Sequence, residues 1–282
     1  MSQALTAAAP QFGVHALPPV LEALRALGDR MPANRVGGWG VSLLRRICLA
    51  LHGQPCDVVL FGSQRARLYP RDNRCEKRAF AGAHLWDGAE RDFLNRCITG
   101  PDFVFVDAGA NVGLYTLSVR AGVQARGARL AGVAIEPDPV NAARLRFNLA
   151  ASGADEVRVV EAALSDRPGR LRLASAGQAN RGEVRAAADG DVEVPALPLL
   201  DVLRAAGLTR VDALKMDIEG MEAAVLAPFL AAAPAALKPA VLLLETGREG
   251  RPDLVDLAVR HGYRTRMRTR INTILELAPS DR

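Results

Sequence analysis

Three charged side chains alternate in the run KMDIEG, which extends from Lys215 to Gly220. Where the backbone is extended, residues two apart share a face, so Lys215, Asp217 and Glu219 are expected to converge. A carboxylate within hydrogen-bond reach can take a proton from a hydroxyl group, which accelerates a reaction by about 10² to 10⁴. We therefore predict that Asp217 is the base that takes such a proton, or the group that orients the hydroxyl of an acceptor molecule. Glu219 would lie beside it, and Lys215 would limit their repulsion.

Other roles for these charges stay open at this point. Glu219 is equally suited to begin and cap the next helix, where a carboxylate interacts favourably with the helix dipole, and Lys215 to serve as an ion-pair partner. Glu245, which ends the apolar run AVLLLE, is a further catalytic candidate with a structural alternative. Two neighbouring carboxylates can hold Mg²⁺ or Ca²⁺, but the sequence identifies no third oxygen ligand, so a divalent metal is possible and not indicated.

A second motif, VFVDAGANVG, occupies Val104 to Gly113 and joins an apolar strand to a helix through a glycine-rich turn. Gly109 lacks the Cβ that would block a ligand, and Gly113 allows the helix to pack closely. Asp107 can pair with the ammonium of a methionine moiety. Glu136 ends the next strand 23 residues after Gly113, near the spacing of about 20 expected for an acid that binds ribose hydroxyls.

These residues distinguish between two classes of nucleotide ligand. The glycines follow GxxxG in place of the GxGxxG of dinucleotide sites, and a carboxylate before them repels phosphate but attracts a cationic tail. The motif therefore predicts an S-adenosylmethionine site and a methyltransferase. Two alternatives remain: a protein that binds this cofactor without catalysis, and a nicotinamide-dependent oxidoreductase.

Alternating strands and helices are predicted to position both motifs from Asp102 onward. Continuous apolar runs are typical of strands that are covered on both faces. The expected strands are 103–107, 130–136, 156–161, 211–217 and 240–245, and the expected helices are 112–121, 139–151 and 199–206. An antiparallel hairpin of 263–268 and 272–277 closes the sheet edge, with Arg264, Arg266 and Arg268 in solvent. The predicted fold is α/β, a doubly wound, mostly parallel, seven-stranded sheet of the class I methyltransferase (Rossmann-like) type.

The first hundred residues lack this alternation and are expected to form a helical and hairpin extension. We predict an extension at 1–56, a lead-in at 57–101 and the methyltransferase domain at 102–282. The stretch 38–52 reads as an amphipathic helix with Trp39, Leu43, Leu44, Ile47 and Leu51 apolar. That face is expected to pack on the protein, with contact to a membrane surface as the less common alternative.

Smaller expectations concern the surroundings of the site. Residues 57–68 are predicted to form strand material, a small hairpin over the cofactor pocket, and 168–195 is either an insertion that shapes the substrate mouth or a plain loop. Trp39 and Trp86 are expected in the core or in a lid. Tyr115 is expected to be a packing aromatic in its helix, with contact to the cofactor as the less common alternative.

Composition limits the classes of function. The 282 residues, 49% of them hydrophobic, can bury a sizeable core. The net charge of +5 comes mostly from scattered arginines without a dense basic block, so a nucleic-acid partner is not predicted. The cysteines at 48, 56, 75 and 97 form no CxxC pair, and neither a signal peptide nor a long apolar run is evident. We therefore expect reduced thiols, no membrane span and a cytoplasmic location; the oligomeric state is not set by the sequence.

The sequence resembles the FkbM-type methyltransferases from about Val58 to Leu277. The resemblance is carried by VFVDAGANVGLYTL, IEPDPVNAARLRFNL, AALSD and, most specifically, DALKMDIEGMEAAVL, followed by VLLLE. It implies methylation of a hydroxyl on a small molecule such as a sugar, glycolipid or polyketide, with S-adenosylmethionine as donor. It also implies that the cofactor is held by Asp107, Gly109, Ala110, Asn111, Gly113, Glu136, Pro137 and Asp217, with the backbone around Ala163 and Leu164 bordering the adenine.

Overall fold

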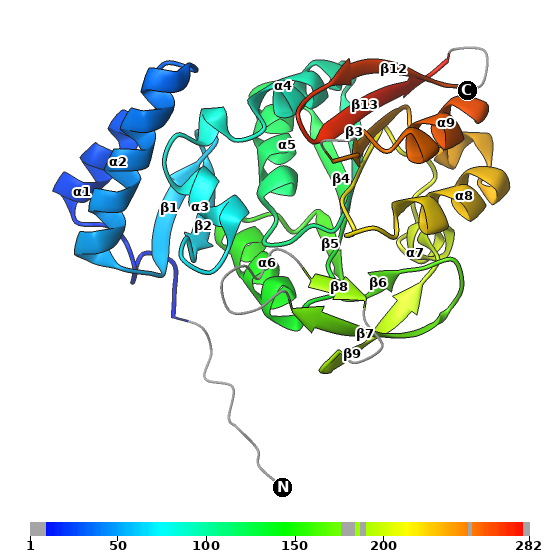
Figure 1. Cartoon of the computed structure of the whole chain (residues 1–282), viewed down its shortest axis with the longest axis horizontal. Helices are drawn as coiled ribbons and strands as arrows, with labels where there is room; N and C mark the ends of the chain where they lie inside the picture. Colours follow the sequence, from blue (N-terminus) through cyan, green and yellow to red (C-terminus); the bar gives the residue numbers. More distant parts are fainter. Residues whose placement is uncertain (1–9, 176–183, 187–189, 248–249, 279–282) are drawn as a thin grey trace, which may run out of the picture.

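A central sheet organises the computed structural model, which describes residues 10–175, 184–186, 190–247 and 250–278 (Figure 1). Within these residues seven strands hydrogen-bond in the order β12-β13-β11-β10-β3-β4-β5. The pairs among β3, β4, β5, β10 and β11 are parallel, whereas β13 is antiparallel to both of its neighbours. The predicted fold class is confirmed. The strands are β3 (Asp102–Ala108), β4 (Arg129–Ile135), β5 (Val157–Val160), β10 (Ala213–Met216), β11 (Val241–Glu245), β12 (Tyr263–Arg268) and β13 (Asn272–Leu277).

Helices cover both faces of this sheet, and the strand sequences alternate accordingly. In β3, Phe103 and Phe105 join the buried cluster that includes α5 and α6, whereas Val106 and Ala108 join the cluster formed with α7, α8 and α9. Burial on both faces is why these strands are continuous apolar runs. The helices are α5 (Leu114–Ala125), α6 (Pro139–Ser152), α7 (Leu199–Ala205), α8 (Glu222–Ala232) and α9 (Pro252–Arg260), with a short 3₁₀ turn η2 (Ala235–Leu237).

Residues 10–101 form helices and one hairpin beside the sheet (Figure 1). The hairpin rests on α6, where the backbone N–H of Arg67 donates to Asn148 Oδ1 at 2.7 Å. It contributes no residue to the cavity described below, so its predicted place over the cofactor pocket was wrong. The elements are α1 (Pro19–Gly28), α2 (Arg35–His52), β1 (Cys56–Leu60), β2 (Gln64–Leu68), α3 (Arg74–Phe80), η1 (Ala83–Leu85) and α4 (Gly88–Cys97).

Helix α2 buries a different face from the one predicted. Its buried residues recur at helical spacing as Gly37, Val41, Leu44 and Cys48, and they face α1 and the turn after α3. Trp39 is 73% exposed, and Leu43, Ile47 and Leu51 are also exposed. The prediction failed because α2 has two apolar faces, and periodicity does not say which one is covered.

The insertion after β5 is folded where the structure describes it. Four short strands, β6 (Ala163–Leu164), β7 (Gly169–Ser175), β8 (Val184–Ala186) and β9 (Val192–Leu197), form a second sheet in the order β6-β9-β7-β8. Residues 176–183 and 187–189 of the predicted insertion lie outside the described part of the chain. No described helix is long and apolar enough to cross a membrane.

One buried ion pair attaches the N-terminal segment to the hairpin. Arg67 Nε donates to Asp57 Oδ1 at 2.7 Å, and the side chains are 4% and 0% exposed. Asp57 Oδ2 also accepts from the backbone N–H groups of Gly13 and His15. Burial alone would raise the pKa of Asp57, but these donors outweigh it and lower the pKa.

We expect Asp57→Ala to lower the free energy of unfolding by about 3–5 kcal/mol, because it leaves a buried arginine without its carboxylate. Urea denaturation measures this change. Glu276→Ala is the matched control, since it removes the partner of Arg266 from a pair in which that arginine is 54% exposed, and it should cost less than about 1 kcal/mol. Equal losses in the two variants would contradict the assignment.

Candidate functional site

A cavity of about 350 Å³ opens at the carboxyl ends of β3, β4, β10 and β11. This is where ligands bind to open α/β sheets, and the volume lies within the range of small-molecule sites. Most of the residues predicted from the sequence line it. They are Gly109, Ala110, Asn111, Glu136, Pro137, Ala163, Leu164, Lys215, Asp217, Glu219 and Glu245.

Two predicted residues, Asp107 and Gly113, are not among the lining residues. Gly113 has a φ of +87°, and a Cβ there would lie 2.6 Å from Leu145 Cδ1, so this glycine permits close packing of α6. Asp107 is fully buried, and its Oδ2 accepts from the hydroxyl of Thr116 at 2.7 Å. A direct contact of Asp107 with a bound amino-acid tail therefore stays a prediction.

The glycine-rich turn is held against the end of β10. A Cβ on Gly109 would lie 1.8 Å from the carbonyl oxygen of Asp217, and Gly109 has a φ of +74°. The backbone N–H groups of Gly109 and Ala110 both donate to the carbonyl oxygen of Ile135. The turn is thus fixed by β4 on one side and by β10 on the other, and glycine is required by both space and backbone conformation.

Lys215 lies at the centre of the site, and its buried side chain contacts the glycine-rich turn. Its Nζ donates to the carbonyl oxygen of Gly109 at 2.6 Å and lies 3.5 Å from Asp107 Oδ1 and 3.8 Å from Asp217 Oδ2. Burial disfavours the charged ammonium, but Asp107 and Asp217 outweigh burial and raise the pKa of Lys215. The predicted convergence of charges is therefore present, with Lys215 between two carboxylates.

Glu136 also orders the turn while it faces the cavity. Its Oε2 accepts from the backbone N–H of Asn111 at 2.7 Å, and its Oε1 accepts from that of Asp138 at 3.0 Å. Burial raises the pKa of Glu136 to about 7 despite these donors. Each carboxylate oxygen retains capacity for another donor, as recognition of a hydroxyl pair requires.

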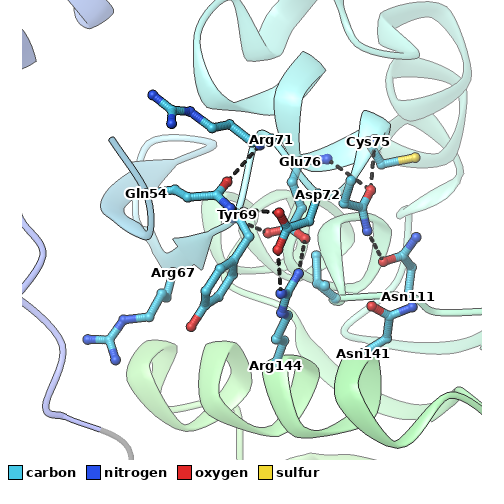
Figure 2. Close-up of polar contacts among 12 residues, drawn as sticks. Gln54, Arg67, Tyr69, Arg71, Asp72, Cys75, Glu76, Asn111, Asn141 and Arg144 are labelled. Carbon is cyan, nitrogen blue, oxygen red and sulfur yellow. Dashed lines mark hydrogen bonds and ion pairs between the residues drawn. The ribbon is translucent and has the colours of Figure 1, made fainter. Parts of the chain in front are cut away.

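The segment before α3 supports the turn from the N-terminal side. Asn73 is 1% exposed; its Oδ1 accepts from the backbone N–H of Cys75, and its Nδ2 donates to Asn111 Oδ1 at 2.7 Å. Figure 2 shows Asn111 pointing toward this segment. Asn111 has a left-handed φ of 52°, so a contact with its side chain helps to hold the strained backbone.

An ion-pair cluster fixes this segment on α6, as Figure 2 shows. Arg144 lies 3.1 Å from both Glu76 and Asp72, and Glu76 also accepts from the backbone N–H of Tyr69. Burial raises the pKa of Glu76 to about 7, although Arg144 opposes the shift. Asn73 and Glu76 are spaced like a capping pair at the start of α3, a signal that could have indicated this helix, but no sequence pattern indicates the contact with the turn.

Three carboxylates converge on the cavity at the ends of β10 and β11. Burial, followed by a hydrogen bond to Asp217 and the charges of Asp217 and Glu219, raises the pKa of Glu245 to about 9. The shift favours the protonated form of Glu245, which shares a proton with Asp217 through their hydrogen bond. This separation of acid and base between neighbouring carboxyl groups is typical of sites that transfer protons.

Glu219 does not begin or cap the following helix, as one alternative held. Helix α8 starts at Glu222, whose Oε1 accepts from the backbone N–H groups of Ile218 and Gly220. Glu219 precedes it with a φ of 54° and lines the cavity. Glu222, and not Glu219, satisfies the backbone that leads into the helix.

Part of the wall was missed by sequence reasoning. Tyr115 packs against Trp86 with ring centroids 5.0 Å apart and donates to Asp87 at 3.0 Å, and all three residues line the cavity. Trp86 is buried, as expected, and Tyr115 combines packing with a place in the wall. Asn272 adds a wall from the C-terminal hairpin, and its Nδ2 donates to Glu90 Oε1. Trp86, Asp87 and Asn272 belong to no local motif, whereas Tyr115 lies in the run VFVDAGANVGLYTL.

Two further expectations, on the insertion and on a metal ion, concern the same cavity. Leu171 and Leu173 of β7 line it, which supports the prediction that the insertion shapes the mouth. Among the residues that the structure describes, no group of three or more His, Cys, Asp or Glu side chains is arranged to hold a metal ion.

A family model described as the Methyltransferase FkbM domain matches residues 107–265, which is more than half of the chain. The matched range contains most of the glycine-rich turn motif, from Asp107 onward, and the whole KMDIEG run. No curated protein sequence matches the chain.

Several solved structures are similar at low identity. The methyltransferase FkbM from Methylobacillus flagellatus KT is 19% identical with a TM-score of 0.46; the match covers 73% of this chain and 55% of that one. A precorrin-6y C5,15-methyltransferase from Geobacter metallireducens GS-15 is 15% identical, with a TM-score of 0.41 and coverages of 66% and 86%. TrmK from M. capricolum, solved with S-adenosyl-homocysteine, is 9% identical, with a TM-score of 0.40 and coverages of 66% and 66%.

Because Gly109 lies so close to the end of β10, we expect one added methyl group at this position to lower the stability of the fold strongly. Gly109→Ala should destabilise the fold clearly more than Gly127→Ala, because Gly127 has a similar φ of +66° but no atom within 4 Å of the position that a Cβ would take. The control should cost only the strain of a side chain in the left-handed region, about 1–2 kcal/mol. Chemical denaturation of both variants checks this, and similar midpoints would show that the contact is unimportant.

Protonation of Glu245 predicts a pH dependence of stability. Its pKa of about 9 in the folded protein lies above the ordinary 4.5. Its stabilising contribution to the free energy of unfolding is therefore full below about pH 4.5 and is lost as the pH rises through 9. Glu76 and Glu136 act in the same direction but titrate near 7. Between about pH 7 and 9, wild-type stability should therefore fall, and Glu245→Gln should flatten this fall in urea titrations. Parallel curves for the two proteins would refute the assignment.

Proposed function

We propose that this chain, which belongs to the FkbM methyltransferase family, transfers a methyl group from S-adenosylmethionine to a hydroxyl group of a small molecule. The observation that carries the proposal is the meeting of the glycine-rich turn, Glu136 and the proton-sharing pair of Asp217 and Glu245 in one cavity. Cofactor recognition and proton transfer thus have separate groups within reach of one another. Membership of a methyltransferase family disfavours the nicotinamide alternative.

The residues of the cavity fit this cofactor. Glu136 offers a buried carboxylate to ribose hydroxyls, and the small and apolar side chains of Ala163, Leu164 and Leu173 offer a surface to adenine. When bound, S-adenosylmethionine supplies an electrophilic methyl group.

Asp107 is assigned a supporting part in cofactor binding. Its Oδ1 is buried and accepts no hydrogen bond, but it lies 3.5 Å from the Lys215 ammonium. Lys215 in turn donates to the carbonyl oxygen of Gly109. Loss of Asp107 would therefore release the lysine that shapes the turn. Asn111 and Ala110 present that turn to the cofactor.

We assign Asp217 to the hydroxyl of the acceptor. Its side chain is 39% exposed and lines the cavity, whereas Glu245 supplies it with a hydrogen bond. A carboxylate oriented in this way can take the hydroxyl proton as the oxygen becomes a nucleophile. An acid held against the sulfonium would favour the ground state, since that positive charge disappears in the transition state. We therefore place Asp217 and Glu219 toward the acceptor.

The partner and location follow from the same features. The cavity is small and lies at strand ends, and it is not an extended basic groove of the kind that binds nucleic acid. This favours a small hydroxylated acceptor, such as a sugar, glycolipid or polyketide-type compound. No disulfide joins the four cysteines at 48, 56, 75 and 97, all of which lie in the described part of the chain, as expected in a reducing compartment. We propose a cytoplasmic location on this basis.

Separate substitutions test cofactor binding and turnover. Glu136→Ala should weaken S-adenosylmethionine about 10- to 100-fold, because it removes a carboxylate that accepts ribose hydroxyls; isothermal titration measures this. Asp217→Asn should preserve cofactor affinity but lower turnover by about 10² to 10⁴. Turnover is followed as S-adenosylhomocysteine release with a panel of hydroxylated acceptors.

The alternative of binding without catalysis has a different outcome. Tight binding of S-adenosylmethionine with no release of S-adenosylhomocysteine from any hydroxylated acceptor would overturn the enzymatic proposal. If Asp217→Asn and Glu136→Ala impaired cofactor binding equally, the division between acceptor-facing and cofactor-facing acids would be wrong.

A further inference from the structure

The exposed apolar side chains of this protein are concentrated on one helix. Of the twelve large hydrophobic residues that are exposed in the described part of the chain, eight precede residue 52. Five of these form a stripe along α2, with exposed fractions of 72%, 73%, 57%, 37% and 70% for Val36, Trp39, Leu43, Ile47 and Leu51, respectively. We call these five residues the α2 ridge. Their spacing of three or four residues places them on one face.

The ridge is held rigidly and points away from the body of the protein. The opposite face of α2 is packed: Cys48 Sγ donates to the carbonyl oxygen of Leu21, and Arg45 donates to that of Ala81. Figure 1 shows α1 and α2 together at the outer edge of the molecule, beyond the β1–β2 hairpin. Because one face is anchored, exposure of the other is a property of the folded state.

The charges beside the ridge have one sign. Helix α2 contains Arg35, Arg45 and Arg46 and no acidic residue. Arg35 and Arg46 are exposed and lie four residues before Trp39 and three after Leu43, next to the ridge on the helix surface. Glu22 of α1 and Asp29 at its C-cap both pair with Arg25, which offsets one of their two negative charges. The surface is thus apolar with a cationic margin.

We propose that the α2 ridge docks this protein on an anionic lipid surface, with α2 lying in the plane of the interface. An apolar face that carries tryptophan and leucine beside arginines is the composition of interfacial helices, and tryptophan favours the boundary between headgroups and acyl chains. A second copy of the chain is disfavoured, because a twofold contact would bring the same arginines together. The inference is independent of the proposed transfer reaction.

Vesicle binding tests the proposal. The full chain should sediment with phosphatidylcholine vesicles that contain phosphatidylglycerol, more weakly at high salt, and not with phosphatidylcholine alone. Trp39→Ser/Leu43→Ser should reduce the affinity by at least about tenfold. Arg35→Glu/Arg46→Glu should abolish the preference for anionic lipid. Trp39 emission should shift to the blue on binding, while Trp86, which is 3% exposed, contributes a constant background.

Val59→Ser/Val259→Ser is the matched control, since these side chains are 46% and 49% exposed but lie outside the ridge, and it should bind vesicles like wild type. Unchanged titration of S-adenosylmethionine by the ridge variant shows that the fold is intact. Equal binding by wild type and the ridge variant, or no binding to anionic vesicles, overturns the proposal. So does a dimer in solution that the ridge substitutions dissociate without any effect of lipid.

Discussion

The site depends on the buried ammonium of Lys215. It lies between the carboxylates of Asp107 and Asp217 and donates to the carbonyl oxygen of Gly109. Two acids on adjacent parallel strands would repel each other in a buried environment, and a shared cation removes that repulsion. The same cation fixes the turn. One side chain therefore couples the charge balance of the site to the shape of its cofactor-facing loop.

Around this centre, the cavity is assembled from distant parts of the chain. The sheet contributes its strand ends, the N-terminal segment contributes Trp86 and Asp87, and the C-terminal hairpin contributes Asn272. Hydrogen bonds tie these parts together, as between Asn272 and Glu90 and between Asn73 and Asn111. The N-terminal elements thus complete the site even though the sheet topology is formed without them.

Sequence patterns predicted the sheet and its motifs because most of the parallel strands are apolar runs, the strand at 263–268 alternates, and each motif is local. They failed where the outcome depends on which surfaces meet. The exposure of Trp39 follows from the choice between two apolar faces of α2. Likewise, the contact of Asp87 with Tyr115 joins residues that no periodicity connects. The separation of Asp107 from the cavity depends on the position of Lys215, which lies on another strand.

The contact between Gly109 and Asp217 involves the main chain of Asp217, not its carboxylate. Substitution is therefore restricted more strongly at position 109 than at position 217. Position 109 admits no side chain without displacing β10, whereas position 217 can exchange its side chain while the backbone stays in place. Under the assignment proposed above, substitutions at 217 and 219 would change the groups that face the acceptor without rebuilding the glycine-rich loop.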